Sequence, residues 1–380
     1  MKYDLLVKNG EVLDPGQGLR GALDVAVVGG TIAQIAKDIP AEEAAEVVDA
    51  RGKLVTPGLI DMHTHSAWGI SAISIDPDVQ AAKGAVCTQV DAGSVSAETF
   101  RGLRRFIIDR FASRVFSFLR ITPSRSRWDM SQDPRNALQA NRMPTEMVIE
   151  ENRDVVLGLK VFCGWNVAGP AADPSLDYAR DVADRRGVPI MVHISTRPPT
   201  IEDVVARLKE GDILTHCCTG HDQRIVDMFG KLKPEVKAAR ERGVLLDVGH
   251  GQGSFDFRVG QLLLDQDEAP DIISTDLHGH CVNGPTYNLV TTLNKFLCMG
   301  MGLEDVILRA TANPAKVIGR LEGLGALIVG GIADISILEY TDGEFELVDC
   351  HRVVKVLRKG LVPVMAICRG KILRVPDAWR

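Results

Sequence analysis

The middle of the chain alternates between short apolar runs and stretches with helical features. The apolar runs are rich in β-branched residues and lie at residues 59–65, 84–91, 115–121, 156–162, 188–193, 212–216, 244–248 and 271–276. The stretches between them include residues 175–187 and 200–211, each of which ends in glycine, a common residue at a helix stop. The second begins with Thr200 and has Asp203 three residues later, which is close to a capping box. Strands that alternate with helices indicate parallel βα units, and eight of them predict an α/β fold with a (β/α)8 TIM barrel over residues 56–324.

The two ends of the chain share a different pattern of short alternating apolar segments. Residues 3–12 and 23–36 are interrupted by Asn-Gly and Gly-Gly, dipeptides that favour hairpin turns, and residues 326–374 have a similar pattern. Neither end alone provides a self-sufficient core. We therefore predict one small β-sandwich that is built from both termini, residues 1–55 and 325–380.

The composition is that of an ordinary globular protein. Of the 380 residues 45% are hydrophobic and 25% are charged, and the formal net charge is −6. No block of Lys or Arg stands out, so we expect a small-molecule substrate and no nucleic-acid partner. The first residues lack the pattern of a signal peptide and no apolar run reaches the roughly 18 residues of a membrane span, so no membrane association is expected. The eight cysteines are scattered and fit neither a disulfide framework nor a CxxC zinc site, which favours a cytoplasmic location.

The first apolar run ends in two histidines. His63 and His65 are two positions apart, so both side chains point to the same face of a strand, and Asp61 shares that face. Two imidazoles on one face at the end of a strand form a chelate for a divalent metal. By itself the pair is weak evidence, because histidines at a strand end also occur as structural or surface residues.

Three later runs also end in a polar residue. The fifth run ends on His193, the sixth on His216 and the eighth on Asp276. The carboxyl ends of the strands form the face of a TIM barrel that carries the active site. A single histidine at a strand end is more often a hydrogen-bonded core or rim residue, but four histidines and an aspartate at one end of a barrel favour a metal centre.

The fourth run contains a lysine among apolar residues. Burial of Lys160 would be costly unless the amine were paired or chemically altered. One interpretation is an ion pair with a carboxylate such as Asp61 or Asp276. The other is carboxylation, in which the neutral amine takes up CO₂ and becomes a carbamate whose two oxygens can bridge two metal ions.

Together these residues resemble the binuclear amidohydrolase superfamily. The shared pattern is His-x-His on strand one, a lysine on strand four, histidines on strands five and six and an aspartate on strand eight. Similar segments elsewhere are LLVKNGEVLDP, VVDARGKLVTPGLIDMHTH, TANPAKVIG (311–319) and GGIADISIL (330–338). The resemblance therefore extends nearly from end to end of the chain.

The resemblance implies a set of metal ligands, namely His63, His65, Lys160, His193, His216 and Asp276. The first two histidines and the aspartate would hold the more buried ion, the two later histidines the more exposed ion, and carboxylated Lys160 would bridge both. Zinc is the ion best suited to these donors, although manganese, iron and cobalt also fit them. Dimers and larger assemblies are common in the superfamily, so a homo-oligomer is compatible with the resemblance.

The resemblance also implies a mechanism. The nucleophile would be a hydroxide that bridges the two metal ions, because the ions lower the pKa of a bound water to around neutrality. Asp276 would be the catalytic group that accepts the proton of the water and delivers it to the leaving group.

Within the superfamily the chain is most similar to the dihydroorotase-like amidohydrolase/deacetylase group. The segments that carry this similarity are GAVCTQVDAGS (84–94), VLLDVGHGQGSFDF (244–257) and STDLHGHCVNGP (274–285). The similarity implies hydrolysis of an acyl ester or amide of a small carboxylate, such as O-acetyl-(R)-mandelate or an N-acyl amino acid. The chain departs from that group after Lys160, where Val161, Phe162 and Cys163 stand in place of an expected basic residue.

Other activities are alternatives to this one. A cyclic amidase of the dihydroorotase or hydantoinase kind and an N-acyl-D-amino-acid deacylase belong to the same superfamily. Dihydroorotases usually have an arginine soon after the His-x-His motif, and HTHSAWG has none. The mononuclear deaminase branch lacks the lysine on strand four. A non-catalytic scaffold would be expected to lose ligands, whereas this chain retains all six.

Four residues are candidates for substrate binding, namely His250, His278, Asn283 and Arg197. His250 ends the seventh run and His278 follows the eighth, and each is either a hydrogen-bond partner of the substrate or a histidine of the rim. Arg197 follows strand five and would either pair with a substrate carboxylate or be a solvated loop residue. Asn283 begins an Asn-Gly-Pro turn that we expect at the edge of the pocket.

Overall fold

The computed structural model describes residues 1–122 and 134–374 and contains the predicted barrel. Its seven parallel strands follow one another in chain order, as β8 (Leu59–Thr64), β9 (Val86–Ser96), β10 (Arg114–Arg120), β11 (Val156–Phe162), β12 (Ile190–His193), β13 (Ile213–Thr215) and β14 (Leu245–Asp247). Because these strands are parallel, their carboxyl ends meet at one edge of the sheet. The polar residues that end the strands are therefore brought to the same side of the molecule.

The eighth run closes the barrel without forming a regular strand. Ile272 forms a single parallel bridge with Asp247 of β14, and Leu277 forms one with Thr64 of β8. Between these bridges Asp276 has a φ of 49°, in the left-handed region, which interrupts a β-ladder. The prediction of a regular eighth strand is therefore wrong, although the segment occupies the eighth position of the barrel.

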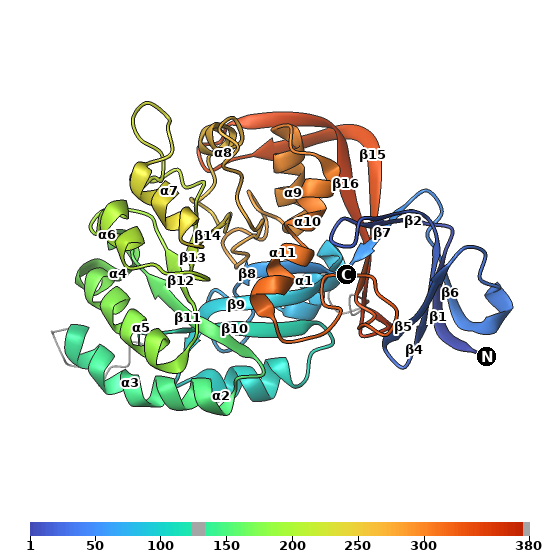
Figure 1. The fold of residues 1–380 in the computed structure, drawn as a ribbon, viewed down its shortest axis with the longest axis horizontal. Coiled ribbons are helices and arrows are strands. Elements are labelled where there is room, and N and C mark those ends of the chain that lie inside the picture. The colour runs from blue at the N-terminus through green and yellow to red at the C-terminus, as the bar shows by residue number, and fades with distance from the viewer. Residues whose placement is uncertain (123–133, 375–380) are drawn as a thin grey trace.

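Helices follow the strands and cover the outside of the barrel (Figure 1). They are α1 (Pro77–Gly84), α2 (Phe100–Leu103), η2 (Arg104–Ile108), α3 (Pro134–Glu151), α4 (Trp165–Ala168), η3 (Gly169–Ala171), α5 (Ala172–Arg186), α6 (Ile201–Ala206), α7 (Pro234–Glu241), α8 (Phe257–Leu264), α9 (Leu289–Cys298), α10 (Leu303–Leu308) and α11 (Ala312–Ile318). Most of these helices contribute residues to one large buried core that they share with the strands.

The two helices predicted from the sequence are present, with one difference. α5 ends directly before Gly187, which has a φ of 61° and forms the left-handed cap. α6 begins after Thr200, and both hydrogen bonds of a capping box join Thr200 to Asp203. The prediction that α6 ends at Gly211 is wrong, because the helix ends at Ala206. Gly211 has a φ of 82° and does not cap α6. Its N–H donates to the carbonyl oxygen of Gly243, just before β14, at 3.0 Å.

Strands from both ends of the chain form the predicted β-sandwich. One sheet contains β5 (Thr31–Ala36), β4 (Asp24–Val28), β1 (Tyr3–Lys8) and β6 (Ala44–Asp49), with the short η1 (Ala41–Glu43) before β6. The other contains β17 (Lys371–Ile372), β16 (Val354–Cys368), β15 (Ile335–Val348), β7 (Leu54–Pro57), β2 (Glu11–Asp14) and β3 (Leu19–Ala22). Val7 and Val25 from the first sheet pack with Val55 and Ile337 from the second in one buried cluster. The domain boundaries stay a prediction.

The chain at Asn9 and Gly10 does not form the predicted hairpin. β1 and β2 lie in different sheets, so the dipeptide carries the chain from one sheet to the other. Asn9 has a φ of 63° and donates its backbone N–H to Asp24 Oδ1 at 3.0 Å. A Cβ atom at Gly10 would lie 2.4 Å from Val55, so only glycine fits there. The second dipeptide, Gly29–Gly30, does connect the antiparallel strands β4 and β5.

A long hairpin of β15 and β16 extends from the sandwich along α9 toward α8, on the outside of the barrel (Figure 1). Its residues Leu347 and Leu361 belong to the buried core of the barrel rather than to that of the sandwich. On α9, the side chain of Asn294 donates to the carbonyl of Leu361 at 2.9 Å and accepts from its N–H at 2.8 Å. The C-terminal part of the chain therefore packs firmly on α9.

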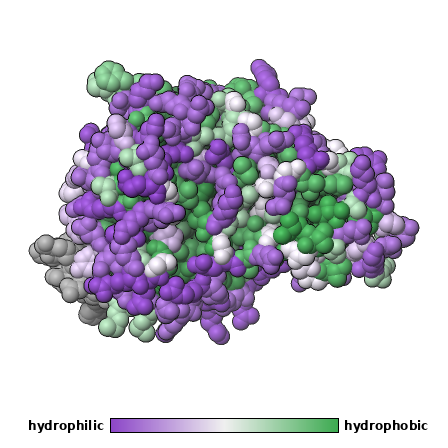
Figure 2. All heavy atoms as spheres, in the orientation of Figure 1, coloured by the Kyte–Doolittle hydropathy of each residue, from purple (hydrophilic) through white to green (hydrophobic). Residues whose placement is uncertain are grey.

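The molecular surface is mixed in character. On the face shown in Figure 2, hydrophilic residues cover most of the barrel helices, and hydrophobic residues lie between them and over part of the sandwich. Within the described ranges, no helix has both the length and the apolar character that a membrane crossing requires.

Candidate metal centre

All six predicted ligands lie together at the carboxyl end of the barrel. His63 and His65 come from β8 and the residue after it, Lys160 from β11, His193 from β12, His216 from the residue after β13, and Asp276 from the eighth segment. The imidazole ring of His63 lies 5.1 Å from that of His216, which lies 4.3 Å from that of His193. The six side chains therefore converge, as the alternation of side chains along a strand and the positions of these residues at the strand ends predicted.

His63 has one nitrogen engaged by the protein and one directed into the cluster. Nδ1 lies 2.9 Å from Thr215 Oγ1 and 3.3 Å from Asp247 Oδ2. The Thr215 hydroxyl donates to Asp247 at 2.6 Å, so it accepts from His63 and Nδ1 carries the hydrogen. The lone pair is then on Nε2, which lies 2.8 Å from Lys160 Nζ and 3.3 Å from Asp276 Oδ1.

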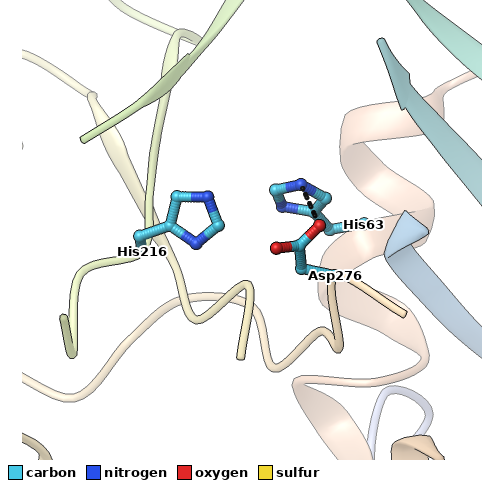
Figure 3. A group of neighbouring side chains, drawn as sticks. All are labelled: His63, His216 and Asp276. Atoms are coloured by element: carbon cyan, nitrogen blue, oxygen red, sulfur yellow. Dashed lines mark ion pairs between the residues drawn. The ribbon is translucent and has the colours of Figure 1, made fainter. Parts of the chain in front are cut away.

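His216 has the same arrangement. Its Nδ1 lies 2.6 Å from the carbonyl oxygen of Gly249, and a carbonyl only accepts, so Nδ1 is the donor. Its Nε2 is buried and has no hydrogen-bond partner among the described residues. Figure 3 shows His216 on the opposite side of the cluster from His63 and Asp276, and the donor atoms of these three residues all lie within 4.8 Å of one another. An unpartnered lone pair at such a place fits a metal ion.

His193 presents the other nitrogen. Its Nε2 lies 3.2 Å from Ser195 Oγ, and that hydroxyl donates to Asn166 Oδ1 at 2.6 Å. Ser195 therefore accepts from His193, which leaves the lone pair on Nδ1. Three histidines of the cluster are thus each held by an outer hydrogen bond that fixes the tautomer and leaves one nitrogen free to bind a metal, as metal-binding histidines commonly are.

Asp276 is the carboxylate of the cluster. Its Oδ1 lies 3.0 Å from His65 Nε2 and 3.3 Å from His63 Nε2, while His65 Nδ1 lies 2.8 Å from Ser94 Oγ. Burial opposes ionisation of this carboxyl, but the imidazoles, His63 foremost, hold the pKa of Asp276 well below its usual range. Both Asp276 and His216 have a positive φ, 49° and 67°, a strained conformation that is frequent at functional sites.

Burial lowers the pKa of three imidazoles well below that of a free histidine, namely His63, His193 and His216. All three are therefore neutral at neutral pH. Neutral imidazole is the form that binds a metal ion.

Lys160 is completely buried beside the histidines. Its Nζ lies 2.8 Å from His63 Nε2 and 3.6 Å from the sulfur of Met191. Within the described part of the chain it forms no ion pair with Asp61 or Asp276. The carboxylate of Asp61 instead accepts hydrogen bonds from the backbone N–H and the hydroxyl of Thr275 in the eighth segment. Burial lowers the pKa of Lys160 to about 8, which raises the fraction of neutral amine at neutral pH.

A glycine makes room for the Lys160 side chain. A Cβ atom at Gly93 on β9 would lie 2.6 Å from Lys160 Cγ and 2.8 Å from its Cβ. Gly93 also has a φ of 86°, which other residues rarely adopt. The position of the lysine in the barrel therefore depends on glycine in the neighbouring strand.

The cluster has a supporting shell that the sequence did not reveal. Asp247 at the end of β14 accepts from Thr215 and from Ser274, both at 2.6 Å. Gly249 has a φ of 46°, and a Cβ there would lie 2.9 Å from Nδ1 of both His63 and His216. In the sequence, Asp247 and Ser274 look like the polar residues at any strand end. Only the contacts of Asp247 with His63, Thr215 and Ser274 show that these residues orient a histidine of the cluster.

The substrate-binding candidates lie in different surroundings. His250 is buried and both of its ring nitrogens contact the protein. The ring of His278 lies 5.8 Å from that of His65, next to the cluster. Asn283 is exposed in a turn, and the exposed Arg197 pairs with Asp222 at 3.2 Å. Their roles toward a substrate stay predictions.

The chain is similar to several known proteins over most of its length. A model described as the amidohydrolase family matches residues 54–373. A deacetylase of Agrobacterium fabrum is 30% identical over 97% of this chain and 91% of its own length. Among solved structures, an adenine deaminase has a TM-score of 0.87 at 29% identity and covers 97% of this chain and 99% of its own. A dihydroorotase has a TM-score of 0.85 at 28% identity and covers 97% of this chain and 98% of its own.

Proposed function

The chain belongs to the amidohydrolase family and is a hydrolase, and from that premise we propose that it cleaves an acyl ester or amide of a small carboxylate at a binuclear metal centre. The observation that carries the proposal is the buried Nε2 of His216, which has no hydrogen-bond partner among the described residues and faces the donors of His63 and Asp276. A lone pair left in this way is costly unless a ligand satisfies it.

The proposed centre holds two divalent ions, and zinc is the best match for imidazole and carboxylate donors. The ligands are the six residues His63, His65, Lys160, His193, His216 and Asp276. The ions would supply an activated water as nucleophile and polarise the carbonyl of the substrate. Support comes from the geometry, because three of the four histidines have outer hydrogen bonds that leave a lone pair inside the cluster.

Lys160 is proposed to carry a carbamate. The neutral amine attacks the carbon of CO₂, so that an N–C bond forms while one C–O π bond opens and its electron pair moves to oxygen. One N–H proton is released to water, and a neutral amine becomes an anionic carbamate. The lowered pKa of Lys160, caused by burial, favours the neutral amine that this reaction requires. The resulting anion would also suit a place between two cations and next to the neutral His63 ring at 2.8 Å.

Asp276 is proposed to move the proton. The pKa of its carboxyl is lowered, so Asp276 is ionised at neutral pH and can accept the proton of the attacking water. It can then deliver that proton to the leaving alcohol or amine. Asp276 is buried at the carboxyl end of the barrel, and its Oδ1 lies 3.0 Å from Nε2 of His65.

The substrate class rests on the relatives. The deacetylase that is similar over 97% of this chain supports removal of an acyl group, and we propose O-acetyl-(R)-mandelate-like esters or N-acyl amino acids as substrates. An N-acyl-D-amino-acid deacylase is the nearest variant of this proposal. The likeness to a dihydroorotase at 28% identity favours a second candidate, the opening of a cyclic amide.

A substrate panel on zinc-loaded protein tests the proposal. It contains both enantiomers of O-acetyl mandelate and of several N-acetyl amino acids, with dihydroorotate, a hydantoin and adenine as competing substrates. Asp276→Asn serves as the control for contaminating hydrolases. Turnover of linear acyl compounds by the wild type and not by the control is the expected result, whereas opening of rings alone would overturn the deacylase proposal in favour of the second candidate.

A further inference from the structure

A second lysine is buried beside the metal centre. Lys295 on α9 is completely buried, and burial of an amine is costly unless hydrogen bonds satisfy it. Its Nζ has three acceptors, namely His250 Nε2 at 2.5 Å, the carbonyl oxygen of Val348 at 2.6 Å and that of Pro285 at 3.0 Å. The three acceptors match the three donors of an ammonium group.

His250 is held in one orientation by its neighbours. Its Nδ1 lies 2.8 Å from the carbonyl oxygen of Gly251 and 3.0 Å from Thr286 Oγ1. Its ring stacks on Phe255, with centroids 4.7 Å apart and planes inclined by 10°. The ring therefore directs Nε2 toward Lys295, and both nitrogens are engaged within the protein.

His250 is the middle residue of a tripeptide, Gly249–Gly251, that packs on the proposed ligands. The carbonyl of Gly249 accepts the hydrogen bond of His216 Nδ1 at 2.6 Å. A Cβ atom at Gly251 would lie 2.5 Å from Asp276 Oδ2, so the backbone of this residue lies directly against the carboxylate. A displacement of the His250 backbone would move both of these contacts.

A neighbouring residue of α9 also joins that helix to the hairpin of β15 and β16. Asn294, the preceding residue of α9, already joins that helix to Leu361 of β16 by two hydrogen bonds, at 2.9 and 2.8 Å. Lys295 bonds to the hairpin at Val348 on β15 and also reaches the side chain of His250, with which Asn294 forms no hydrogen bond within the described ranges.

From these contacts we infer that Lys295 is a positioning residue of the metal centre, which acts through His250 on the Gly249–Gly251 tripeptide and so fixes His216 and Asp276. The inference rests on the proposed function, because it assumes that these two residues bind metal. Lys295 itself touches neither the ligands nor the substrate. Partners of metal ligands commonly change metal affinity or activity by about 10–100-fold when removed.

The test compares Lys295→Met, His250→Phe and the double variant with the wild type. Phenylalanine keeps the stacking on Phe255 but has no ring nitrogen. The readouts are the zinc dissociation constant, measured by competition with a chelator, and the tautomer of His216 in the metal-free protein, measured by ¹⁵N NMR of labelled histidine. We expect about 10-fold weaker zinc binding, the low end of the range for direct partners of ligands, and loss of the fixed Nδ1–H tautomer in each variant. The double variant should be no worse than the more affected single one, because the two residues act as a unit.

Asn294→Ala is the matched control. It removes a buried polar side chain next to Lys295 and weakens the packing of the hairpin, so it should lower Tm and leave zinc affinity and the His216 tautomer unchanged. If Lys295→Met does not fold, Thr286→Val gives a milder change at the same tripeptide, because Thr286 Oγ1 donates to Gly251 O at 2.7 Å. That variant should weaken zinc binding by a smaller factor.

Two outcomes overturn the inference. One is wild-type zinc affinity and tautomer in folded Lys295→Met or, where that variant does not fold, in Thr286→Val. The other is additive effects of Lys295→Met and His250→Phe in the double variant. Failure of the proposed function is a different result, since the wild type itself would then bind no zinc or cleave no acyl substrate.

Discussion

Lys160 Nζ lies 2.8 Å from Nε2 of His63, although the two residues are 97 positions apart in the chain. The contact joins β11 to β8 across the barrel and places an amine among neutral imidazoles. An ordinary structural lysine would pair with a carboxylate, and Lys160 pairs with neither Asp61 nor Asp276 within the described ranges. This relationship is the basis of the first prediction.

Lys160→Ala should lower both metal content and activity, by more than about 100-fold for activity, because loss of a direct ligand costs more than loss of a supporting residue. Short carboxylic acids such as acetate or propionate should restore part of the activity by taking the place of the carbamate. Zinc content by elemental analysis and turnover with and without propionate measure this. A variant with full metal content and full turnover would rule out the bridging role.

His216→Asn should remove one zinc ion per chain and most of the turnover, since the buried Nε2 of His216 has no other partner among the described residues. His221→Asn is the control, because His221 is a half-buried histidine outside the cluster. Elemental analysis of both purified variants is the measurement. Equal zinc content in the two would contradict the assignment of His216.

Gly93→Ala should lower activity and zinc content as well as stability. A Cβ at Gly93 would lie 2.6 Å from Lys160 Cγ and must displace that side chain. Gly52→Ala is the matched control, because Gly52 has a φ of 73° and no atom of the described residues beyond its chain neighbours would lie within 4 Å of a Cβ there. Both variants carry the cost of about 1–2 kcal/mol of a left-handed alanine, which thermal unfolding measures. Only the first should lose zinc, and a similar loss in Gly52→Ala would refute the explanation.

Asp24→Asn should reduce stability at neutral pH by about 1–3 kcal/mol and have little effect in acid. Burial raises the pKa of Asp24, but hydrogen bonds from Lys8, Asn9 and Ile39 more than offset this, so the pKa is lowered overall. A lowered carboxyl pKa contributes stability that is full above the unfolded value of about 4 and is lost as the pH falls through the folded value. Urea unfolding of variant and wild type at pH 7 and at about pH 3 measures the difference, and an equal difference at both pH values would contradict this origin.

Much of the site could be predicted because it depends on local rules. The strand period places His63 and Asp61 on one face, and parallel strands place His193 and His216 at the same end of the barrel. The apolar surroundings of Lys160 in its strand indicated burial without any knowledge of its neighbours. These inferences need only the chain around each residue and the general geometry of a βα unit.

Other features could not be predicted because they depend on contacts between distant segments. The eighth segment appears regular in sequence, and only its single bridges to β14 and β8 reveal the irregular closure at Asp276. Asn9 and Gly10 have the composition of a hairpin turn, but the buried contact of Gly10 with Val55 directs the chain into a second sheet. Lys295 lies in an apolar helix, and its partner His250 is 45 residues away.

The number of zinc ions bound per chain tests the binuclear centre most directly. Freshly purified wild-type protein, incubated with zinc and bicarbonate and freed of unbound metal, is analysed for zinc and for protein in the same sample. We predict two ions per chain, held by the four histidines, carboxylated Lys160 and Asp276. One ion or fewer would contradict the binuclear centre, and with it the proposed roles of Lys160 and Asp276.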